Sequence, residues 1–174
     1  MRRFFDLLAR ALLMMGGYCA AALCASAALH LLTLPALGFD SAEIPMVMAG
    51  TFVFSVPFVA LFVAYFAFVP VLAVIAIAEL WSLRSWIYHV AAGGMIGFGI
   101  AMRFRALAPE DAIAVGVDTP FLAPGNSILD PRLALVLVLS GMAGGLAYWL
   151  VAGRSSGSWK RSRAAAATPP PGPQ

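Results

Sequence analysis

The sequence predicts an all-α membrane protein with four transmembrane helices, and three observations carry this prediction. Hydrophobic residues make up 62% of the chain and charged residues only 11%, whereas soluble domains contain about 25% charged residues. No charged residue occurs between Glu43 and Glu79, and an apolar run of about 18 residues or more is typical of a transmembrane helix. Three further apolar blocks are each bounded by charged residues. Backbone in lipid must satisfy its own hydrogen bonds, so each block is expected to be helical.

The first helix is expected at about residues 11–37, between Arg10 and Asp40. Arg2 and Arg3 precede its apolar region, which makes a cleaved signal peptide an alternative. The apolar region is longer than the roughly 7–15 residues of most signal peptides. We therefore expect it to remain as a transmembrane helix.

The second helix is expected within residues 44–78. At ~1.5 Å per residue this run would measure about 52 Å, whereas the hydrocarbon core of a bilayer is about 30 Å thick. The helix is therefore expected to be broken at a proline, and Pro57 and Pro70 are the candidates. Because Trp81 marks one membrane boundary, we place the break near Pro57 and the spanning part at about residues 57–78.

The third helix, at about residues 85–102, and the fourth, at about 133–153, share a pattern of glycines four positions apart. Small residues at this spacing let helices approach closely in lipid, where van der Waals contact drives association. The same spacing also serves contacts between copies of a chain, so packing within the bundle and a homo-oligomer are both open. The predicted helix-packing residues are Gly93, Gly97, Gly141 and Gly145.

Basic residues are distributed unevenly among the connecting segments. Of the 11 Lys and Arg residues, only Arg103, Arg105 and Arg132 fall on the side opposite the termini. Cytoplasmic segments carry the excess of positive charge, so both termini are expected in the cytoplasm. Within a transmembrane domain of residues 1–153, residues 104–131 would form an extracytoplasmic loop. Residues 154–174 would form a basic, proline-rich and disordered cytoplasmic tail.

Glu79 is the titratable residue that ends the long uncharged run. An acidic side chain inside a membrane is costly and often functional, as in proton-coupled transporters. Glu79 also stands five positions before Arg84 and close to Trp81. We predict an interfacial or intramembrane ion pair between Glu79 and Arg84, and a proton-carrying role is the alternative.

The sequence carries no pattern that indicates a metal, a cofactor or nucleic acid. His30 and His89 are the only histidines, and the expected helices place them roughly 20 Å apart in depth, too far for one haem. Cys19 and Cys24 lie five positions apart and do not form a Cys-x-x-Cys pair. The chain also lacks a phosphate loop, a zinc-ligand spacing and the motifs of hydrolases. We therefore expect no metal, no cofactor, no nucleic-acid partner and no enzymatic activity.

The segment Gly144-Gly145-Leu146-Ala147-Tyr148-Trp149-Leu150-Val151-Ala152-Gly153-Arg154 resembles parts of small inner-membrane proteins of alphaproteobacterial type. Ala78-Glu79, Arg84-Ser85 and Ala92-Gly93-Gly94 contribute to the same resemblance. It implies a four-helix layout in a bacterial inner membrane. It implies no activity, because no activity is known for these proteins.

Taken alone, the sequence favours a non-catalytic accessory or assembly component of a membrane complex. The small-residue faces predict helix contacts within a bilayer, with another membrane protein or with a second copy of the chain. The alternative is a transporter of small solutes or ions, in which Glu79 and the proline-broken second helix form the pathway. In either case the expected location is the bacterial inner membrane, with both termini in the cytoplasm.

Overall fold

The computed structural model describes residues 2–33, 46, 49–107 and 131–156, and the described regular structure is entirely helical. It comprises four α-helices, which confirms the all-helical class with four helices. Their bounds are α1 Arg2–Thr33, α3 Val56–Trp81, α4 Trp86–Leu107 and α5 Pro131–Val151. A π-helical turn, η2 Thr51–Ser55, precedes α3, and a short 3₁₀ turn, η4 Gly153–Ser155, follows α5.

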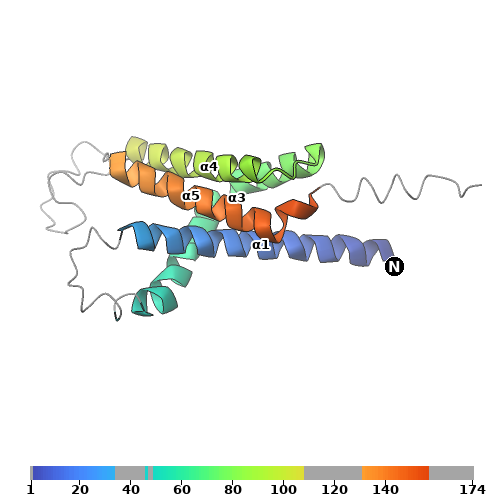
Figure 1. Ribbon diagram of the computed structural model, residues 1–174, viewed down its shortest axis with the longest axis horizontal. Coiled ribbons are helices and arrows are strands. Elements are labelled where there is room, and N and C mark those ends of the chain that lie inside the picture. The colour runs from blue at the N-terminus through green and yellow to red at the C-terminus, as the bar shows by residue number, and fades with distance from the viewer. Residues whose placement is uncertain (1, 34–45, 47–48, 108–130, 157–174) are drawn as a thin grey trace, which may run out of the picture.

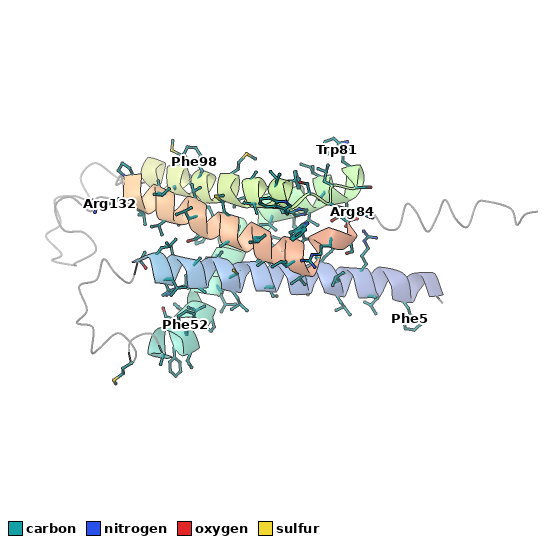
Figure 2. The ribbon with its side chains drawn as sticks, viewed as in Figure 1. Phe5, Phe52, Trp81, Arg84, Phe98 and Arg132 are labelled. Carbon is teal, nitrogen blue, oxygen red and sulfur yellow. The ribbon has the colours of Figure 1, made fainter. Side chains whose placement is uncertain are left out.

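Three of the helices lie side by side, and the fourth crosses behind them. Figure 1 shows α5 between α1 and α4, and α3 running obliquely behind this layer. We call the end where α1 begins and α5 ends the Arg10 end, and the opposite end the Arg132 end. Figure 2 shows Trp81 and Arg84 at the Arg10 end, Arg132 at the other, and Phe52 on a part of the chain that projects beyond α1.

Three helices are long and apolar enough to cross a membrane, at Leu8–Thr33, Phe52–Trp81 and Pro131–Val151. Helix α4 has 22 residues, which corresponds to about 33 Å and is sufficient in length. It is less apolar than those three segments because it contains His89, Arg103 and several glycines. The fold is therefore compatible with a membrane, and a fourth span remains a prediction.

The start of α3 differs from the expected break. The backbone is helical from residue 49 to Trp81, through both Pro57 and Pro70, so the expected interruption near Pro57 does not occur. Instead the helix widens into η2 immediately before α3, and Pro57 lies in the first turn of α3. A proline ring clashes with the carbonyl group four residues earlier and lacks an N–H donor. A π-helical turn at this point relieves both constraints without separating the two segments.

Glycines determine how closely α4 and α5 approach. A Cβ atom built on Gly93 would overlap the carbonyl oxygen of Gly141, and one built on Gly141 would overlap that of Gly93. Gly97 lies in the same way against the backbone of Leu137, and Gly145 against that of His89. The structure thus brings together the backbones of two helices at the four glycines that the sequence singled out. Such close contact requires residues without side chains.

Helix α3 contacts the layer through a narrow face. The buried residues of this helix are mostly small and are separated by 4, 7 and 11 positions, which correspond to about one, two and three helical turns: Val56, Ala60, Ala67 and Ala78. Its outer face carries exposed aromatic and aliphatic side chains along the whole helix, with Tyr65 77% exposed. Helix α3 is therefore apolar almost all round, as expected of a helix surrounded by lipid.

Three other expectations concern the connecting segments. Most of the expected loop at 104–131 and of the expected tail at 154–174 lies outside the described residues. Helix α1 begins at Arg2 instead of residue 11, so Arg10 lies within the helix and not before it. A single arginine is a good helix former and does not end a helix.

Candidate functional site

Several polar contacts between the described residues lie at the Arg10 end. The Arg10 guanidinium, on α1, forms an ion pair with the Glu79 carboxylate near the end of α3, with 2.5 Å between Nη2 and Oε2. Both side chains are only 18% exposed. The same guanidinium nitrogen also lies 3.4 Å from the carbonyl oxygen of Ser155, to which it donates. Arg10 therefore joins the first turns of α1 to the ends of both α3 and α5.

The turn between α3 and α4 is built by a residue in the left-handed conformation. Ser82 has a φ of 56° and follows the last residue of α3. Its backbone N–H and that of Leu83 donate to the carbonyl oxygen of Ala78, in the manner of a C-terminal helix cap. The chain can then reverse within four residues and present Arg84 to the end of α5.

Arg84 binds the end of α5 through its side chain and its backbone. Its Nε donates to the carbonyl oxygen of Ser156 at 2.8 Å, and its carbonyl oxygen accepts from the Trp149 indole N–H at 2.8 Å. The sequence predicted Arg84 as the partner of Glu79, whereas the ion pair recorded on Glu79 is with Arg10. The guanidinium of Arg154 lies 4.6 Å from the centre of the Trp149 ring, as a cation–π contact.

Helix α3 is attached to its neighbours mainly by hydrogen bonds to its backbone. Tyr18 of α1 donates its hydroxyl to the carbonyl oxygen of Ala64. The fully buried Ser26 of α1 donates to Val56 O at 2.8 Å, and Tyr88 of α4 donates to Val74 O at 3.1 Å. These contacts, with the Arg10–Glu79 ion pair, hold α3 at both ends and near its middle.

The two histidines adopt the same ring orientation. The Nδ1 atom of His30 lies 2.8 Å from the carbonyl oxygen of Ser26, and that of His89 lies 2.9 Å from the carbonyl oxygen of Ser85. A carbonyl can only accept, so in each ring Nδ1 carries the proton and a neutral ring leaves Nε2 as an acceptor. In His30 the Ser55 hydroxyl, 2.7 Å away, donates to Nε2. In His89 the Nε2 atom is buried and has no partner among the described residues.

A cavity of about 500 Å³ lies between α3 and the three-helix layer. Its lining is almost entirely apolar and comes from all four helices. The Arg10 end is lined by His89 and by Tyr148, whose rings stack with 5.6 Å between their centres. Its other end is lined by Leu29, Phe58 and Leu137. Ser140, also in the lining, is the second described residue with a buried, unpartnered side-chain atom, its hydroxyl oxygen.

A second, more open cleft of about 670 Å³ lies between α3 and α4. It is lined by apolar side chains and glycine except for Arg103, an exposed residue near the end of α4. Most of its lining residues do not line the first cavity, and none of them has a buried polar side-chain atom without a partner.

Within the described part of the chain, no group of three or more His, Cys, Asp or Glu residues is placed to hold a metal ion. Cys19 is exposed and Cys24 half-buried, and both are free thiols. Arg10, Tyr18, Ser26, Tyr88 and Trp149 therefore join separate elements, whereas Thr33 bonds only within its own helix.

Sequence reasoning did not identify Arg10, Ser55 or Ser140 as structurally important. Arg10 was open to inference, because the predicted topology placed it at the same end of the bundle as Glu79. The serines were not, since a serine in an apolar helix is indistinguishable from any other small residue until the helices are positioned.

Comparison of the chain with protein-family models, with curated proteins and with solved structures found no match in any of the three.

Proposed function

We propose that this chain is an integral protein of a bacterial inner membrane, with four spans and with both termini in the cytoplasm. The support for this orientation is the gathering of Arg10, Arg84 and Arg154 at one end of the layer. That end would face the cytoplasm, where anionic lipid headgroups attract basic side chains. Helix α4 would span with the others because it lies along α5 and is long enough to cross.

Within this membrane the protein would act as a non-catalytic accessory or assembly component. The observation that carries this proposal is the outer face of α3. The helix is fixed to α1 and α4 by hydrogen bonds on its inner side, while large apolar residues on its outer side remain exposed: Leu61, Tyr65 and Val69. A rigid apolar ridge of this kind suits contact with another transmembrane helix, because packing and not desolvation drives such contacts.

The test is isolation of the full chain from its native membrane in a mild detergent, followed by crosslinking from position 65. A stoichiometric protein partner that crosslinks to a probe at Tyr65, and is lost when Leu61 and Val69 are replaced by tryptophan, would support the proposal. Met95 of α4 is equally exposed, so Met95→Trp is the matched control and is expected to leave the complex intact. Recovery of the chain alone, with crosslinks only to lipid, would contradict the proposal.

A small-solute or ion transporter is the second candidate, and one observation favours it. The cavity of about 500 Å³ lies beside a helix that contains a π-helical turn and Pro70, and irregular helices often border transport sites. Glu79 lies close to one end of this cavity and would be the proton carrier. Loss of a proton-coupled flux in proteoliposomes on Glu79→Gln, with retention of the folded protein, would favour this candidate over an accessory role.

A further inference from the structure

We propose that the open cleft between α3 and α4 binds one acyl chain of an anionic phospholipid, whose phosphate group lies on Arg103. This inference rests on the membrane location given under the proposed function, but not on the orientation or the accessory role given there. It depends on three features: a lining that follows one face of α4, an opening on the outside of the bundle, and a guanidinium at one end of the cleft.

The cleft forms because α3 and α4 diverge from the turn that joins them. Tyr88 of α4 holds α3 close through its hydrogen bond to Val74 O. Further from the turn, α3 runs obliquely behind the layer while α4 stays within it (Figure 1). The lining residues Ala73 of α3 and Gly99 of α4 are too small to fill the space between the two helices, and a cleft of about 670 Å³ remains.

The lining on α4 gives the cleft its direction and length. These residues recur at spacings of three and four positions along one face of the helix, and Arg103 is the last of them: Ala92, Met95, Ile96, Gly99, Ile100 and Arg103. Ala92 and Arg103 are 11 positions apart, which corresponds to about 16 Å along the helix. This length is about half the ~30 Å thickness of the hydrocarbon core. With Arg103 at the headgroup level, the cleft therefore reaches the middle of the bilayer, as an acyl chain does.

The cleft opens on the outside of the bundle, where lipid surrounds a membrane-spanning protein. Met95, in the lining, is 71% exposed, and Ala73 and Gly99 are exposed as well. A Cβ atom on Gly99 would meet no atom within 4 Å, so the space beside this glycine is open. An acyl chain can thus enter the cleft directly from the bilayer.

Arg103 determines which headgroup the site prefers. It is the charged residue of the lining, and neither a hydrogen bond nor an ion pair is formed by its exposed side chain within the described part of the chain. A guanidinium binds phosphate oxygens through two parallel N–H groups, and its long stem can extend from an apolar helix to the headgroups. The described lining contains no carboxylate that could bind the ammonium group of a zwitterionic lipid. An anionic headgroup, such as that of phosphatidylglycerol, is therefore preferred.

The test uses the full chain in phosphatidylcholine nanodiscs with phosphatidylglycerol that carries a diazirine in one acyl chain. We expect photocrosslinks on Ala73, Met95 and Gly99. Unlabelled phosphatidylglycerol should displace the probe about fivefold more effectively than added phosphatidylcholine with the same chains, the factor for one arginine beside an anionic lipid. Crosslinks spread over the whole outer surface, or equal displacement by the two lipids, would overturn the proposal. Failure of the chain to insert into nanodiscs would overturn the membrane location as well.

Two variants with the same change of net charge separate a site from general attraction. Arg103→Gln should abolish the preference for phosphatidylglycerol. Arg154→Gln removes an arginine at the Arg10 end, where its recorded contact is with the Trp149 ring, and should retain the preference. Equal behaviour of the two variants would show that Arg103 does not hold the headgroup.

Larger side chains in the cleft test where the acyl chain lies. Gly99→Leu and Ala73→Leu enlarge exposed positions of the lining and should prevent crosslinking at Met95, whereas Ala76→Leu, exposed on α3 outside the lining, should not. If Gly99→Leu does not fold, Ala73→Leu decides, and undiminished crosslinking in that variant counts against the cleft. A photoreactive residue at position 95 should capture lipid. Capture of a second copy of the chain would show that the cleft is a protein interface and would overturn the proposal.

Discussion

Replacement of Gly93 by alanine is expected to push α4 away from α5. The new Cβ atom would lie 3.0 Å from the carbonyl carbon of Gly141 and 3.1 Å from the backbone nitrogen of Gly145, and closer still to the Gly141 carbonyl oxygen. Carbon atoms in ordinary contact are about 3.5 Å apart or more. All three neighbours are backbone atoms and cannot rotate away, so the two helices must separate by at least about 0.5 Å.

The cost of this separation can be isolated with a second glycine on the same helix. A Cβ atom on Gly99 would meet no atom within 4 Å. Alanine favours a helix over glycine by about 1 kcal/mol at both positions, whereas overpacking typically costs about 1–3 kcal/mol. The difference in the free energy of unfolding between Gly93→Ala and Gly99→Ala therefore reports the cost of overpacking alone. At about 2–4 °C per kcal/mol for a chain of this size, Tm should differ by about 2–12 °C.

The assay is thermal unfolding of the full chain in one detergent, followed by circular dichroism. It should also include Gly141→Ala and the double variant with Gly93→Ala. Once one alanine has separated the helices, the second meets less resistance, so the double variant should lose less stability than the sum of the two single losses. Equal Tm values for Gly93→Ala and Gly99→Ala would refute the view that backbone contact at Gly93 sets the distance between α4 and α5.

Three further predictions follow from the polar contacts and the topology. Arg10→Gln and Glu79→Gln should each lower the free energy of unfolding by about 1–3 kcal/mol, a value between those for exposed and buried ion pairs. In chemical denaturation the double variant should lose less stability than the sum of the two single losses. Additive losses would mean that the ion pair contributes nothing. Ser55→Ala removes the donor to His30 and should lower stability by about 1 kcal/mol, whereas an unchanged midpoint would show that this bond is not formed in solution. Periplasm-sensitive reporters should be active after Asp118 and silent after Ser158; activity at the second site would reverse the proposed orientation.

The sequence predicted well those features that depend on one helix or on one pair of close neighbours. The glycine spacing indicated which faces of α4 and α5 are suited to close contact, because only glycine permits backbone to touch backbone. The apolar blocks located α4 and α5 to within about five residues, because charged residues stand close to their ends, whereas only the end of α3, beside Glu79, is marked in this way.

Features that depend on the relative positions of three or more helices were not predictable in this way. Glu79 has Arg84 near it in sequence but forms its ion pair with Arg10, 69 residues away. The sequence also contains no pattern that predicts the oblique path of α3 or the cavity beside it. At Pro57 the rule that proline breaks a helix was too simple, because a π-helical turn accommodates the ring while the helix continues.

Because α3 is attached through its backbone, the donor and acceptor residues of each hydrogen bond respond differently to mutation. Tyr18, Ser26 and Tyr88 supply hydroxyl groups, but their acceptors are the main-chain carbonyls of Ala64, Val56 and Val74, which every amino acid possesses. Substitution of a donor destroys its bond, whereas substitution of an acceptor residue preserves it. Apart from Glu79 and the small residues of the buried face, the side chains of α3 are thus free to diverge while the helix keeps its place.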